Sequence, residues 1–144
     1  MIVLKPEEAR LAAVLGETRG DVPAQECRAL GNVISRIGDK WTVMVVGHLS
    51  TGSLRFNDLM RVIPGISHRM LTITLRGLER DGLVNRTAFA TTPPRVDYEL
   101  TELGQSLTVP LSILAGWASA KRTIIEDAQQ RFDQGRDAAA DGRS

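Results

Sequence analysis

Arginine and hydroxyl side chains recur at helical spacing along one side of residues 67–80. Arg69, Thr72 and Arg76 occupy positions i, i+3 and i+7, and the leucines at 71, 75 and 78 fall on the opposite face. A guanidinium group is planar and offers paired N–H donors, which match phosphate oxygens and the edge of guanine. A helix divided in this way can rest on a core through its leucines and present its polar face to a DNA groove. The alternative interpretation is an ordinary solvated helix surface.

Further polar residues border this helix. Ser67 and His68 open it, where backbone N–H groups are free to meet phosphate, and Ser67 is also a favoured N-cap residue. Thr91 and Arg95 lie at a proline-tipped hairpin and would touch the adjacent DNA backbone or minor groove. The predicted DNA-binding set is therefore Ser67, His68, Arg69, Thr72, Arg76, Thr91 and Arg95.

The elements that must position these side chains follow from apolar periodicity and turn residues. Helical spacing predicts helices over about 6–15, 24–37, 40–49, 57–62, 67–80 and from Thr101 onward, the last kinked at Pro110. Strands are expected over 53–55, 83–90 and 95–100, with the two prolines at 93–94 as a hairpin tip. This order predicts an α+β, mostly helical fold: a winged helix-turn-helix with N- and C-terminal dimerisation helices.

The same pattern suggests three regions. Residues 1–22 are interpreted as an N-terminal extension with a short helix, 23–130 as a winged-helix DNA-binding and dimerisation domain, and 131–144 as a flexible tail. The tail is rich in Gly, Ala, Asp and Arg, and chain ends of this kind often fray.

Length and composition fit a globular protein without a membrane span. The chain has 144 residues, 42% hydrophobic and 24% charged, with a net charge of +1. The charge is uneven, because residues 53–98 hold seven arginines and four acidic residues. No apolar run approaches the roughly 20 residues that cross a bilayer, and the N-terminus lacks a signal-peptide pattern. We therefore expect a cytoplasmic protein with no membrane partner.

Five strings of residues follow one another in an order that is typical of a known family. They are Ile-Gly-Asp-Lys-Trp-Thr at 37–42, Arg-Phe-Asn-Asp-Leu at 55–59, Pro-Gly-Ile-Ser-His-Arg-Met-Leu-Thr at 64–72, Leu-Arg-Gly-Leu-Glu-Arg-Asp-Gly-Leu-Val at 75–84 and Pro-Pro-Arg-Val-Asp-Tyr-Glu-Leu-Thr-Glu-Leu-Gly at 93–104. Between Cys27 and about Trp117 the chain resembles the HxlR-type transcriptional regulators, winged-helix proteins related to the MarR group. The resemblance implies a dimeric, sequence-specific DNA-binding regulator whose terminal helices build the dimer.

An apolar stripe on the last helix also predicts self-association. Its members are Leu103, Leu107, Leu111, Leu114 and Trp117. The stripe is longer than a small three-helix core covers, and exposed stripes of that size usually meet a partner. A two-fold dimer would present two such DNA-reading helices about 34 Å apart to a palindromic operator. The alternative is that the helix folds back on its own domain.

The single cysteine, Cys27, is a candidate redox switch. One cysteine excludes an intrachain disulfide, so oxidation would join Cys27 to its counterpart in the dimer or add a small thiol. The resemblance implies a cysteine at this place, a redox sensor in some members, although the family's Cys-Pro is here Cys27-Arg28. Arg28 and Arg36 would favour the thiolate. The alternative is a small buried apolar side chain.

A small-molecule effector is the competing switch. Trp41, Met44, His48 and Trp117 could line an apolar cleft between the dimer helices and the DNA-binding lobe, although all four also suit a plain core. No Gly-rich phosphate loop, His-x-x-x-His or Cys-x-x-Cys motif appears, so we expect no enzyme, no metal and no cofactor. The alternative function is a winged-helix protein-interaction module that does not bind DNA.

Overall fold

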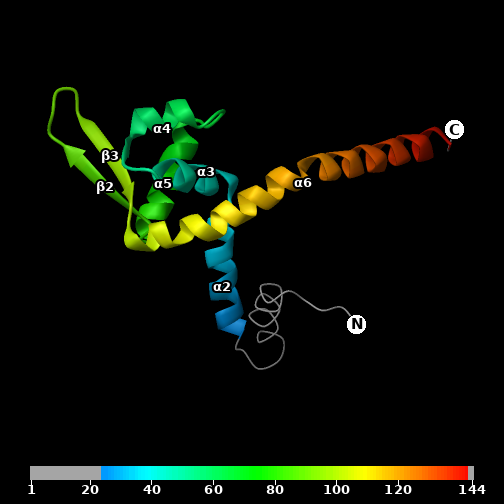
Figure 1. The fold of residues 1–144 in the computed structure, drawn as a ribbon, viewed down its shortest axis with the longest axis horizontal. Helices are drawn as coiled ribbons and strands as arrows, with labels where there is room; N and C mark the ends of the chain where they lie inside the picture. The colour runs from blue at the N-terminus through cyan, green and yellow to red at the C-terminus, as the bar shows by residue number, and fades with distance from the viewer. Residues whose placement is uncertain (1–23, 143–144) are drawn as a thin grey trace. The chain divides into compact units, whose positions relative to one another are not determined.

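The computed structural model describes residues 24–142 (Figure 1). These residues belong to two units, a first that ends at Val43 and a second that begins at Met44. In the first unit, α2 (Ala24–Ile37) ends at Gly38, whose N–H donates to the Ile34 carbonyl at 2.7 Å. The next helix, α3 (Lys40–Leu49), crosses from the first unit into the second. Both helices have the predicted bounds. The predicted extension over 1–22, with its short helix, lies outside the described residues.

The second unit holds the remaining elements in the predicted order. They are β1 (Leu54–Arg55), α4 (Phe56–Val62), α5 (His68–Arg80), β2 (Val84–Phe89), β3 (Arg95–Leu100) and α6 (Glu102–Asp141). The sheet order is β1-β3-β2 and both pairings are antiparallel, with Tyr98 of β3 opposite Leu54 on one side and Arg86 on the other. Figure 1 shows the β2–β3 hairpin beside α4 and α5. The predicted winged helix-turn-helix is confirmed.

The leucine face of α5 lies in the core of the second unit, as predicted. Leu71, Leu75 and Leu78 are each at most 1% exposed. Side chains from the neighbouring elements are buried as well: Leu49, Leu59, Ile63, Leu83, Val84, Tyr98 and Leu100. Burial of one apolar face leaves the opposite face of α5 in solvent, so the core sets which side chains this helix presents.

Both ends of α5 are fixed by local hydrogen bonds. At the start, Ser67 is the N-cap and its Oγ accepts from the Met70 N–H at 3.0 Å. At the end, the Leu83 N–H donates to the Leu78 carbonyl at 2.9 Å and the Gly82 N–H to the Glu79 carbonyl at 3.1 Å. This pair of bonds is a Schellman motif, and it requires the left-handed backbone that Gly82 adopts at φ 78°. Local hydrogen bonds therefore fix the residues at which α5 begins and ends.

The last helix is longer than the sequence pattern suggests. It begins after Thr101, whose Oγ1 accepts from the Gly104 N–H at 3.1 Å, and runs for 40 residues. The helix continues past Pro110, where a kink is predicted, as one ribbon (Figure 1). It also includes residues 131–141, which the sequence suggests as a flexible tail. Extending an existing helix costs far less than starting one, so Ala-rich and Arg-rich sequence can stay helical here.

Among the helices of residues 24–142, none combines the length and the apolar character that crossing a membrane requires.

Candidate nucleic-acid interface

The outward face of α5 carries a row of basic side chains. Arg69, Arg76 and Arg80 are exposed and follow i, i+7 and i+11, opposite the buried leucines. Their guanidinium groups can therefore reach a ligand that lies along the helix without disturbing the core. Thr72 is half-buried, and its Oγ1 donates to the His68 carbonyl at 2.9 Å. The Thr72 hydroxyl can therefore serve a ligand chiefly as an acceptor.

The start of α5 is held by contacts with its own neighbours. The Ser67 hydroxyl is used in the cap, and the side chain remains exposed. The His68 ring packs against Phe56, the first residue of α4, with ring centroids 4.8 Å apart and an interplanar angle of 55°. His68 is also exposed, so one side of its ring is supported by Phe56 while its nitrogens can meet an anion.

At the wing, Arg95 is committed to the hairpin. Its Nη2 donates to Asp97 Oδ2 at 3.1 Å, and its guanidinium lies 4.6 Å from the centre of the Phe89 ring. The Arg95 Nε also approaches Asp97 Oδ1 to 3.1 Å, but without hydrogen-bond alignment, so both buried atoms lack a hydrogen-bonding partner. Thr91 Oγ1 donates to the Pro93 carbonyl at 2.9 Å. Of the two side chains predicted to contact DNA at the wing, Arg95 is therefore half-buried and ion-paired, whereas Thr91 is exposed.

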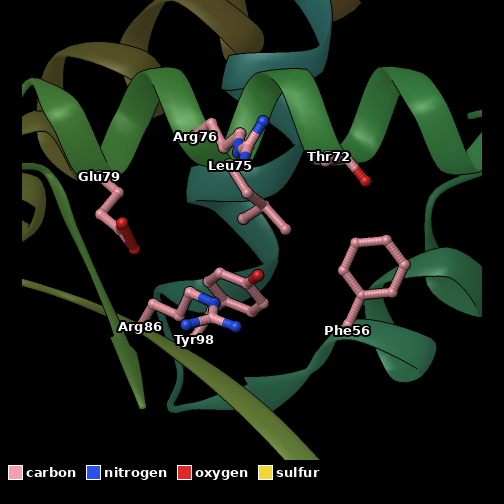
Figure 2. A pocket seen from close by; sticks show the side chains of 7 residues that line it. All are labelled: Phe56, Thr72, Leu75, Arg76, Glu79, Arg86 and Tyr98. Carbon is pink, nitrogen blue, oxygen red and sulfur yellow. The ribbon is translucent and has the colours of Figure 1, made fainter. Parts of the chain in front are cut away.

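A pocket of about 470 Å³ separates α5 from the sheet (Figure 2). Arg76 and Thr72 border it from α5, Arg86 from β2 and Tyr98 from β3. The two guanidinium groups come from opposite walls, with the Glu79 carboxylate at one end (Figure 2). Two guanidinium groups that face one pocket have the donors to pair with an anion such as a phosphodiester. Sequence reasoning missed Arg86 because its approach to Arg76 depends on how β2 packs beside α5.

A second hollow, of about 520 Å³, lies between α4 and the hairpin. It brings Thr91 and Arg95 together with Arg55 and Phe56. Phe56 lines both pockets, so one aromatic ring joins the α5 surface to the wing. Arg55, exposed at the end of β1, is a further cation that sequence reasoning missed, although the string at 55–59 contains it.

One apolar residue interrupts the basic row on α5. Ile73 is 48% exposed and lies four residues after Arg69 and three before Arg76. The spacing of the leucines does not predict this exposed isoleucine, because Ile73 lies outside the face that residues 71, 75 and 78 form. Its helical angle relative to those leucines was the available signal.

The residues of the predicted effector pocket do not gather in either hollow. Trp41 is half-buried, whereas Met44, His48 and Trp117 are exposed, so the plain-core alternative fails for these three. Trp41 belongs to the first unit and the other three to the second. Neither of the two pockets described above includes any of the four. The effector pocket stays a prediction.

The apolar stripe of α6 divides between the core and the surface. Leu111 is buried within its own chain and Leu107 is half-buried, whereas Leu103, Leu114 and Trp117 are more than half exposed. Five exposed apolar side chains that the stripe omits are Val109, Ile113, Ile124, Ile125 and Phe132. The surface available to a second copy is therefore wider than predicted, and Leu111 stabilises the protomer instead.

Cys27 lies within α2, in its first turn.

The helix pair α4–α5 followed by a two-stranded wing defines a winged helix-turn-helix protein. The chain belongs to the HxlR-like helix-turn-helix family, whose model matches residues 36–126. It is a transcriptional regulator of the helix-turn-helix type.

Known relatives agree with this assignment. The uncharacterized HTH-type transcriptional regulator YybR of Bacillus subtilis is 35% identical over 112 residues, which are 78% of this chain and 90% of YybR. Among solved structures, the regulator YtfH of Salmonella typhimurium has a TM-score of 0.65 at 32% identity, covering 69% of this chain and 88% of YtfH. The redox regulator HypR in its reduced form has a TM-score of 0.63 at 36% identity, covering 69% of this chain and 98% of HypR.

Proposed function

We propose that this regulator binds a palindromic operator in double-stranded DNA as a homodimer, with α5 in the major groove. The observation that carries the proposal is the exposed row of Arg69, Arg76 and Arg80 on a helix whose opposite face is buried. Arginine forks can pair with guanine in the major groove and with phosphates beside it. The family assignment supports this use of the helix.

Around α5, the proposed contacts separate into reading and anchoring groups. Arg69, Thr72 and Arg76 face the bases. Ser67 and His68 meet a phosphate at the helix start, where N–H groups favour anions. The pocket between Arg76 and Arg86 seats a second phosphate, and Thr91 and Arg95 lie along the backbone at the wing. Arg95 acts there mainly by holding the hairpin, since its guanidinium is paired with Asp97.

Selection of bound sequences from a random DNA pool tests the proposal. We expect enrichment of an inverted repeat whose half-site centres are about one helical turn, or a multiple of it, apart. Affinity for the selected duplex should fall steeply with salt, because each neutralised phosphate releases counterions. A winged-helix module that binds only proteins would enrich no sequence and would show no such salt dependence.

We also propose that oxidation of Cys27 regulates DNA binding. The support is the likeness to HypR, which was solved in both a reduced and an oxidised form. In the proposed step, the Cys27 thiols of two protomers each lose one electron and one proton to an oxidant such as diamide, which becomes a hydrazine, and one disulfide forms. A disulfide between protomers would change the spacing of the two α5 helices.

Diamide should therefore change the operator affinity of the wild type and leave Cys27→Ser unchanged. Non-reducing electrophoresis should show a cross-linked dimer only in the wild type, and dithiothreitol should restore the starting affinity. An equal response of both proteins to diamide would remove Cys27 from the mechanism and leave DNA binding itself intact.

A further inference from the structure

We propose that Ile73 reads the methyl group of thymine, as the apolar contact between the arginines of α5. This inference rests on the proposed function and adds to it a base identity at one operator position. It begins from the 48% exposure of Ile73 on the outward face of α5.

Exposure alone would carry little weight, since single apolar side chains are common on protein surfaces. What distinguishes Ile73 is its place. Arg69, Ile73, Arg76 and Arg80 follow i, i+4, i+7 and i+11, so Ile73 lies between Arg69 and Arg76 along the helix axis and on the same outward side as the arginines. The face that meets the core is occupied by the leucines of α5, so packing within the second unit does not account for an isoleucine here.

The positive charges on either side of Ile73 indicate which kind of molecule contacts it. A protein surface that covered this isoleucine would also have to neutralise the flanking Arg69 and Arg76, both exposed. The major groove of DNA provides both features, because phosphates and guanine edges accept from arginine, and the thymine C5-methyl is the apolar group on its floor. The charge pattern therefore favours DNA as the occupant.

Helix geometry places this contact close to the arginine contacts. Ile73 is about 6 Å from Arg69 and about 4.5 Å from Arg76 along the helix axis. Successive base pairs are about 3.4 Å apart, so the thymine should lie within about two base pairs of a guanine read by either arginine. The sequences selected from a random pool should show thymine and guanine at this spacing in each half-site.

The test removes the methyl group and nothing else. Each thymine of the selected operator is replaced in turn by deoxyuridine, and the Kd of the full chain is measured by fluorescence anisotropy. We expect one position per half-site at which the wild type binds about fourfold more weakly, the effect of losing one buried carbon. With Ile73→Ala the same replacement should change the Kd less than twofold, whereas Ile73→Val, which keeps a branched apolar side chain, should retain most of the penalty.

Two results would overturn the inference while leaving the proposed function in place. One is wild-type binding that no deoxyuridine replacement weakens. The other is a methyl penalty that Ile73→Ala retains in full, which would transfer the contact to another side chain such as the partly exposed Met70. Failure to enrich any sequence from the pool would reject the proposed function and, with it, this inference. Thymines outside the half-sites serve as the internal control.

Discussion

Arg76 combines two positions that neither of the other arginines of α5, Arg69 and Arg80, shares. It is exposed on the outward face of the helix and also lines the pocket that faces the sheet (Figure 2). A guanidinium in this place can donate hydrogen bonds either to a base edge or to a phosphate. Arg76 is therefore the residue at which the loss of one side chain should be most damaging to DNA binding.

We predict that Arg76→Ala weakens operator binding by about 1–3 kcal/mol, the usual worth of a bidentate arginine contact. Gel-shift titration on the selected operator provides the measurement. Arg76→Lys should recover little of the loss, because an ammonium group cannot reproduce the paired donors. Arg131→Ala, which removes an exposed arginine from α6, is the matched control and should bind normally; similar losses in both variants would point to a general charge effect.

Arg86 leads to a different prediction, because it lines the pocket from β2 and not from α5. We expect Arg86→Ala to weaken binding to all sequences about equally and to reduce the slope of log Kd against log salt by about 1, as for one lost phosphate contact. Arg86→Lys should keep the slope, since a point charge suffices for a phosphate. An unchanged slope in Arg86→Ala would exclude a phosphate from this pocket.

At this scale the sequence predicted some of the site and missed the rest for identifiable reasons. The exposure of Arg69 and Arg76 follows from helical period alone. The pairing of Arg95 with Asp97 was also readable, since residues i and i+2 of a strand face the same side. The approach of Arg86 to Arg76 was not, because it depends on the packing of β2 beside α5.

Between elements, hydrogen bonds join the end of α5, the start of β2 and the start of α6 at one junction. Thr101 Oγ1 donates to the Gly82 carbonyl at 2.6 Å and accepts from the Gly104 N–H, so one hydroxyl links the end of α5 to the start of α6. The Thr101 N–H donates to the Leu83 carbonyl at 3.0 Å. A Cβ on Gly104 would lie 2.1 Å from that same carbonyl oxygen. The orientation of α6 on the wing therefore depends on a glycine at 104.

We predict that Gly104→Ala lowers the free energy of unfolding by about 1–3 kcal/mol, because the added methyl displaces backbone rather than a flexible side chain. Urea unfolding followed by circular dichroism would measure it. Gly135→Ala is the control within the same helix: a Cβ there meets nothing within 4 Å, so alanine should be neutral or stabilise by up to about 1 kcal/mol. Equal stabilities of the two variants would contradict the close approach.

The elements that sequence predicted best are those that local chemistry specifies. The Ser67 cap and the Gly82 turn delimit α5 within one residue of the prediction. The end of α6 was predicted less well, since 131–141 has neither a strong apolar stripe nor a stop signal. Composition suggested a flexible tail there, whereas continuity with the preceding turns keeps these residues helical to Asp141.

For the whole molecule, the exposed apolar surface of α6 is the feature that one chain alone does not explain. Ile113, Leu114 and Trp117 are 69%, 51% and 57% exposed within nine residues of Val109, itself 65% exposed. Such a patch favours contact with another protein. A second copy accounts best for it, because two-fold symmetry would also supply the second α5 that a palindromic operator requires.

We therefore predict that Ile113→Asp combined with Trp117→Asp yields a folded monomer. Each carboxylate would have to be buried without a partner in the dimer, at a cost of several kcal/mol, whereas both positions are exposed in the protomer. Sedimentation equilibrium should show the monomer mass at concentrations where the wild type is dimeric, with unchanged helical circular dichroism. On DNA, the variant should bind a full operator no more tightly than a half-site. Val62→Asp, at an exposed apolar residue of α4, should remain dimeric; a dimer that survives both α6 substitutions would mean that another surface joins the two copies.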